Sequence, residues 1–117
     1  MNIANAETAL IRFVAARCGL TVNSTVFRGE LPPATTGAAV RFTGGRAAGE
    51  DLAEFTAEIS AAFDEPGGAS AFAEALWSGL PLCNTGGFTR IAAAGDMKFA
   101  VSGGKYTVKG ALSVAFC

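Results

Sequence analysis

Histidine is absent from this sequence of 117 residues, and cysteine is scarce. Without histidine the chain has no Ser–His or Cys–His pair, which excludes the common arrangements for nucleophilic catalysis, including one at Cys83. The three cysteines, Cys18, Cys83 and Cys117, are scattered and form no CxxC pair, so their spacing indicates neither a zinc site nor a disulfide framework. We therefore expect reduced thiols, no metal and no cofactor.

Long apolar runs are also missing. Gly, Pro, Asn or a charged residue interrupts every candidate run of about 18 residues, so no transmembrane helix is predicted. The first residues, MNIANAE, lack the basic and apolar regions of a secretory signal. We expect a soluble protein that makes no contact with a membrane. The length predicts one domain, residues 1–117, and the apolar content of 50% predicts a packed core.

Glycine is abundant, but its spacing does not give a phosphate-binding loop. Gly44, Gly45 and Gly49 are not followed by the GK[ST] sequence that such a loop requires. After Lys105, Tyr106 occupies the position where a phosphate loop has Ser or Thr. No nucleotide site is predicted.

Charge is distributed unevenly along the chain, although the net charge is only −1. Residues 1–46 carry +3, residues 47–89 carry −7 and residues 90–117 carry +3. One interpretation is an acidic surface exposed to solvent. The other is that acidic and basic surfaces meet between neighbouring copies, as a head-to-tail ring requires.

The segment Glu54–Phe63, EFTAEISAAF, predicts the central strand of the fold. Apolar side chains occupy alternate positions, which gives a period of two: Phe55, Ala57, Ile59, Ala61 and Phe63. A helix is the alternative, because the segment is rich in Ala and Glu, but a helix would scatter these residues over several faces. As a strand, the segment buries one face and exposes Glu54 and Glu58 on the other.

The remaining chain predicts two helices and further strands. The helices are expected over 5–18, capped by Asn5, and from a cap at Ser70 to about residue 80. Residues 46–50 and 82–87 are expected as connections. Strands are expected over 21–28, 38–43, 88–93, 97–102 and 105–116, with a hairpin turn at Gly103-Gly104. The pattern predicts an α+β fold in which two helices cover a mostly antiparallel sheet of about five or six strands.

The last predicted strand and the second predicted helix each contain a residue whose role can be interpreted in more than one way. Gly110 falls within the last strand and predicts a bulge or bend. That strand is long for a small domain, so part of it is expected to project and pair with another copy. Trp77 lies off the centre of its helix's apolar stripe, where it either closes the edge of the core, which we favour, or anchors a neighbour.

The loop Gly29–Pro33 separates two predicted strands. It is either a plain turn or a functional loop. Its surroundings, VFRGELPP over Val26–Pro33 and AVRFTGG over Ala39–Gly45, resemble the opening half of small tailed-phage proteins of the minor capsid or tail-terminator (tail-completion) family. The order of predicted elements along most of the chain is also similar to that family.

The resemblance implies a tail-terminator-like fold and a structural function without enzymatic activity. It implies a virion protein, assembled in the host cytoplasm, that forms a homo-oligomeric ring, a hexamer in similar proteins. The ring would cap the tail tube, join it to the head-tail connector proteins and let DNA pass without specific binding. The alternatives are a head-tail adaptor or minor capsid component that is monomeric until docked, and a small binding domain or enzyme unrelated to phage.

Nine residues are candidates for these roles. Glu54 and Glu58 would face the lumen of a ring, where an acidic surface repels phosphate. Because they share one face of the predicted strand, catalysis by carboxylates alone is conceivable at these two residues. The candidate interface residues are Phe27, Arg28, Leu31, Pro32, Pro33, Arg41 and Trp77.

Overall fold

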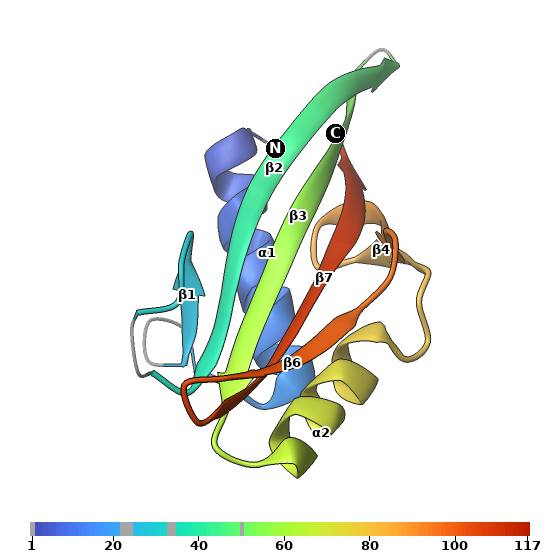
Figure 1. The fold of residues 1–117 in the computed structure, drawn as a ribbon. Coiled ribbons are helices and arrows are strands. Elements are labelled where there is room, and N and C mark those ends of the chain that lie inside the picture. The colour runs from blue at the N-terminus through green and yellow to red at the C-terminus, as the bar shows by residue number, and fades with distance from the viewer. Residues whose placement is uncertain (1, 22–24, 33–34, 50) are drawn as a thin grey trace.

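The computed structural model describes residues 2–21, 25–32, 35–49 and 51–117 (Figure 1). Those residues form two helices and seven strands. In chain order they are α1 (Ile3–Cys18), β1 (Val26–Arg28), β2 (Gly37–Gly49), β3 (Leu52–Phe63), α2 (Pro66–Trp77), β4 (Leu82–Thr85), β5 (Phe88–Ala93), β6 (Lys98–Ser102) and β7 (Lys105–Phe116).

All seven strands belong to one sheet, and both helices lie against the same face of it. The strand order is β1-β2-β3-β7-β5-β4, with β6 paired to β7 beside β5. Only β1 and β2 run parallel among the described pairs. The predicted α+β class is confirmed. The strand count exceeds the expected five or six because Leu82–Thr85, expected as a connection, pairs with β5 as β4.

Helix α1 begins earlier than its sequence pattern indicates. The side chain of Asn2, rather than Asn5, is the N-cap, and its Oδ1 accepts a hydrogen bond of 2.8 Å from the backbone N–H of Asn5. At the other end Gly19 adopts the left-handed conformation, φ 67°, that ends many helices. Between these caps one stripe is buried against the sheet: Ala6, Leu10, Ile11, Val14 and Ala15.

Helix α2 also begins before the predicted cap at Ser70. Pro66 occupies the first turn, where its missing N–H and fixed φ cost nothing, and Glu65 is the N-cap. The end of α2 is held by Arg17 of α1. Its Nε donates to the carbonyl oxygen of Ala75 at 2.9 Å, and its Nη2 donates to that of Ser78. These bonds satisfy carbonyl groups that a helix leaves unpaired.

Strand β3 confirms the predicted alternation. Ala57, Ile59 and Ala61 point to the helices and are buried, whereas Glu54, Thr56 and Glu58 point to the opposite face. Its two neighbours, β2 and β7, place their own buried residues beside these three: Ala38, Val40, Val108, Leu112 and Val114. These residues belong to the core, which lies between β3 and the helices, and each fully buried Val, Leu or Ile side chain in it is worth about 1.5–3 kcal/mol.

The β2–β3 hairpin is longer than predicted. Residues 46–49, expected as a flexible connection, continue β2 and pair with Leu52–Glu54 of β3. We call Gly44–Gly49 together with Leu52–Phe55 the arm. It extends beyond the end of β1 and reaches the far end of the molecule (Figure 1), whose longest dimension is 46 Å.

Strand β7 matches its predicted bounds, but the expectation that it projects is wrong. It lies inside the sheet, with β3 along one edge and β6 and β5 along the other. Gly110 causes no bulge, because the register with β3 is continuous past it. The glycine is explained by Trp77: a Cβ at residue 110 would lie 2.4 Å from Cζ2 of that indole. The favoured interpretation of Trp77, a residue that closes the edge of the core, is confirmed.

Candidate assembly surfaces

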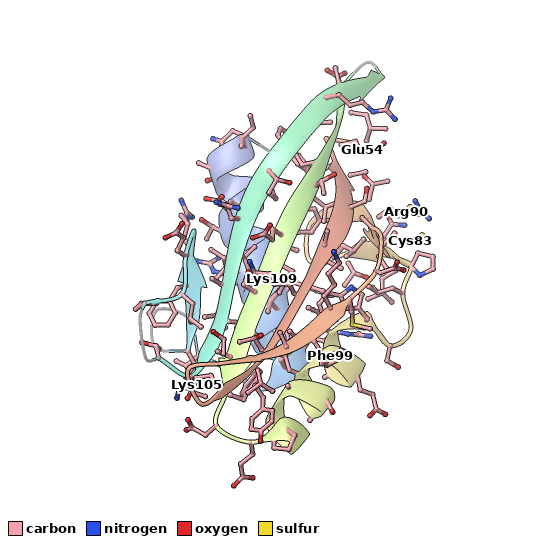
Figure 2. All side chains as sticks on the ribbon, in the orientation of Figure 1. Glu54, Cys83, Arg90, Phe99, Lys105 and Lys109 are labelled. Carbon is pink, nitrogen blue, oxygen red and sulfur yellow. The ribbon has the colours of Figure 1, made fainter. Side chains whose placement is uncertain are left out.

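The sheet has one face covered by helices and one open face. Figure 2 looks onto the open face, with α1 behind the sheet, and labels Glu54 and Lys109 there. Alternate residues of β2, β3 and β7 form this face, and many of them are small: Ala39, Thr43, Thr56, Ser60, Thr107, Ala111 and Ser113. The open face also has a hollow of about 270 Å³, which lies between the loop after β1 and the side chains of Arg41, Glu58 and Lys109.

Glu54 and Glu58 lie on the open face, as predicted, but the face is not acidic. Glu58 forms an ion pair with Arg41 at 3.3 Å, and Glu54 forms one with Arg46 at 3.7 Å. Further cations are placed on the same face by the register of β5, β6 and β7: Arg90, Lys98 and Lys109. The expected acidic surface is wrong, because β2 and β7 contribute positive charge on both sides of β3.

A second surface is an apolar hollow beneath the arm. It has a volume of about 650 Å³ and lies on the helix side of the sheet, between the arm, the start of α1 and the end of β7. We call it the arm hollow; its apolar lining includes Ile3, Ala47, Leu52, Phe55 and Phe116. The rings of Phe55 and Phe116 line the hollow and stack at 5.5 Å between centroids, and Phe55 also stacks on Phe42 at 5.1 Å.

A third surface is β6, whose five residues are all exposed. Phe99 is 57% exposed and Val101 is 68% exposed, and both point to the helix side because they pair with Val108 and Tyr106. Met97, just before the strand, is 39% exposed. We call Met97, Phe99 and Val101 the β6 patch. Among the described residues, the exposed large apolar side chains are these three and Ile3 of the arm hollow.

The candidate residues of β1 and its loop are separated by the sheet. Phe27 is half-buried and its register with Ala39 places it on the open face. Arg28 points to the helices, where its Nε lies 3.1 Å from Oε1 of Glu7 and it also donates to the Thr8 hydroxyl. Arg28 therefore fastens β1 to α1. Leu31 and Pro32 remain accessible, and Pro33 lies outside the described residues.

The other two interface candidates also have contacts within the chain. Arg41 is exposed on the open face and paired with Glu58. The indole of Trp77 packs on Phe72 and on the backbone at Gly110, which leaves it half-buried. The structure thus brings Phe27, Leu31 and Arg41 to one side of the sheet but places Arg28 and Trp77 on the other. Whether any of them contacts a neighbour stays a prediction.

The described residues offer little chemistry. They contain no group of three or more Cys, Asp and Glu residues positioned to hold a metal. Burial raises the pKa of the Cys18 thiol to about 11, against a smaller opposing effect of Arg17, so this thiol is protonated at neutral pH. Neither described helix has the length and apolar character needed to cross a bilayer.

Sequence reasoning missed the arm hollow and the β6 patch. The sequence shows apolar residues at alternate positions, Met97, Phe99 and Val101. Such alternation predicts a strand with one apolar face, but it does not predict which element, if any, covers that face. In the structure no described element covers that face fully, because α2 reaches only its margin near Pro66 and Ala69. The arm has no comparable sequence pattern, since Gly44 to Gly49 have low strand propensity.

Comparisons with known proteins do not assign this chain to a family. No protein-family model matches it, and a search of curated proteins finds no match.

Proposed function

We propose that this protein is a structural component of a tailed-phage virion, a tail terminator that assembles as a homo-oligomeric ring. The ring caps the tail tube, joins it to the head-tail connector proteins and lets DNA pass through its centre. Support from the sequence is the loop string VFRGELPP with AVRFTGG. Support from the fold is the matching order of helices and strands.

The observation that carries the proposal is the placement of exposed apolar groups. All four large apolar side chains exposed among the described residues lie on two separate surfaces, the arm hollow and the β6 patch. A ring of identical subunits needs two different surfaces on each copy, because every copy meets one neighbour with each. A monomeric binding domain would more usually concentrate such groups in one pocket.

The lumen role of Glu54 and Glu58 stays a prediction, and its original physical reason no longer holds. Both carboxylates are paired with arginines, and Lys98 and Lys109 lie on the same face. A face with this charge attracts phosphate rather than repelling it. We therefore do not place the open face on the DNA channel, and the ring model requires a different lining.

The proposed function is tested by disrupting the coding sequence in the phage that carries it. We expect filled heads and separate tails of irregular length, because nothing would stop tube growth or join the two parts. Electron microscopy of the lysate measures both. Complete virions with tails of normal length would contradict the proposal.

The second candidate function is a head-tail adaptor or minor capsid component that is monomeric until docked. It would also leave heads and tails separate, but the separate tails would have their normal length. Light scattering on the purified protein distinguishes the two further: a discrete ring favours the terminator, and a monomer favours the adaptor.

A further inference from the structure

The short strands β1 and β4 end the sheet, and two further strands, β2 and β6, also have edges without a partner in the described part of the chain. Strand β1 pairs with β2 only at residues 38–40, so the outer edge of β2 is unpaired from Arg41 to Gly49 (Figure 1). Strand β6 pairs with β7 along one edge, and no described strand pairs with its other edge. Unpaired backbone edges of this kind accept a strand from another chain.

The two edges present complementary side chains on the same side of the sheet. On β2, Gly45 and Ala47 face the arm hollow, two residues apart. On β6, Phe99 and Val101 face the helix side, also two residues apart. When one strand extends another sheet, residues that face the same side become neighbours, so the large residues of β6 would lie beside the small residues of β2.

The surroundings of Gly45 also favour placing large residues of β6 beside small residues of β2. A Cβ at this position would lie 2.2 Å from Cδ1 of Phe55, so the phenyl ring lies directly over the glycine and reaches toward the free edge of β2. An aromatic or branched side chain arriving at that edge would meet the Phe55 ring and Ile3. Ile3 is 56% exposed in the single chain and would be covered.

We propose that β6 of one copy adds to the outer edge of β2 in the arm of the next copy, with Phe99 and Val101 entering the arm hollow. The occupant of the hollow is thus a second copy of this chain. The junction joins two different surfaces, so it repeats around a ring instead of ending at a two-fold dimer. This inference rests on the proposed function for ring closure, but the junction itself can be tested separately.

The test uses two substitutions at exposed positions, Val101→Asp in β6 and Ala47→Asp in the arm. Each places a carboxylate in an apolar contact, so each alone should abolish the ring and leave a folded monomer by light scattering. The matched control is Ala100→Asp, which adds the same charge to β6 on the opposite face and should keep the ring. Circular dichroism checks that all three variants are folded.

Mixing the two variants gives the sharper result. Val101→Asp retains an intact arm and Ala47→Asp retains an intact β6, so their mixture should form one-to-one dimers and nothing larger. A ring that survives both substitutions overturns the junction while leaving the proposed function standing. Variants that remain monomeric in the mixture also overturn it, because an intact β6 and an intact arm would then be present without forming the contact. A wild-type protein that stays monomeric overturns the junction as well, whereas the phage experiment decides the terminator function independently.

Discussion

The β2–β3 hairpin is one continuous ladder with two different halves. In the covered half, near Val40 and Ile59, the side chains are branched, fully buried and overlaid by α1. In the arm, the same two strands carry mostly glycine, alanine and charged residues besides Leu52 and Phe55, with an unpaired edge along β2. Backbone pairing is common to both halves, so we expect burial, and not pairing, to decide which half stabilises the fold and which is available for contact.

The largest expected difference in unfolding free energy between the two halves comes from shortening one side chain in each of them. Ile59→Ala should lower the free energy of unfolding by about 2–5 kcal/mol, because it opens a cavity in a fully buried site. Leu52→Ala, at the tip of the arm, should cost less than about 1 kcal/mol. Urea denaturation of the monomeric Ala47→Asp background measures both without a contribution from assembly. Equal losses of unfolding free energy in the two variants would contradict the expected difference between the covered half and the arm.

A smaller effect is expected from adding one methyl group to a glycine in each environment. Gly110→Ala should cost about 1–3 kcal/mol, since its Cβ would meet the packed indole of Trp77 at 2.4 Å. Gly45→Ala should cost less, because the Phe55 ring can move into the arm hollow and alanine suits a strand better than glycine.

The contact with Trp77 can be isolated in a double mutant. Combining Gly110→Ala with Trp77→Leu should destabilise by less than the sum of the single losses, because the smaller side chain leaves room for the methyl group. Additive losses, measured by the same denaturation, would mean that the glycine is needed for a reason other than the indole.

The smallest effect is expected at the ion pairs of the two halves. At the base of the hairpin, a hydrogen bond from Lys105 and its positive charge lower the pKa of Asp64. Its contribution to stability is therefore present above the ordinary value of 3.8 and lost as the pH falls through the lower, folded-state pKa. Asp64→Asn should lower Tm slightly at pH 7 and leave it unchanged in strong acid.

The matched control for Asp64→Asn is Glu54→Gln, which removes the looser pair with Arg46 in the arm. Since that pair is exposed and 3.7 Å long, we expect no measurable change in Tm at either pH. A decrease at pH 7 as large as that of Asp64→Asn would show that the arm contributes as much as the base.

The sequence predicted the parts of the fold in which burial imposes a period. Strand β3, strand β7 and the Gly103-Gly104 turn were found because their apolar residues alternate or their glycines mark a hairpin. The distal half of β2 and the four residues of β4 were missed. The distal half of β2 is rich in glycine and alanine, which have low strand propensity, and β4 has only four residues; both are extended because β3 and β5 pair with them.

The surfaces were less predictable than the fold. Charge along the chain placed Glu54 and Glu58 in an acidic block, yet their neighbours in space are Arg41 and Arg46, which precede that block. The exposure of Phe99 depends on where α2 begins relative to β6, and no local pattern encodes that placement. Both errors arise because register between distant strands, not spacing in sequence, sets what a side chain meets.

Strand β7 pairs with two different strands along its outer edge. β5 pairs with Leu112–Ala115 and β6 pairs with Lys105–Lys109, and Gly110, which the Trp77 indole contacts, lies between these two segments. The ribbon Lys98–Ser102 is therefore attached to the sheet through five residue pairs with β7 and not through β5, so a pull on it would be borne by those five pairs rather than by the whole sheet. We expect such a branch to let one strand adjust its angle while the rest of the domain keeps its shape.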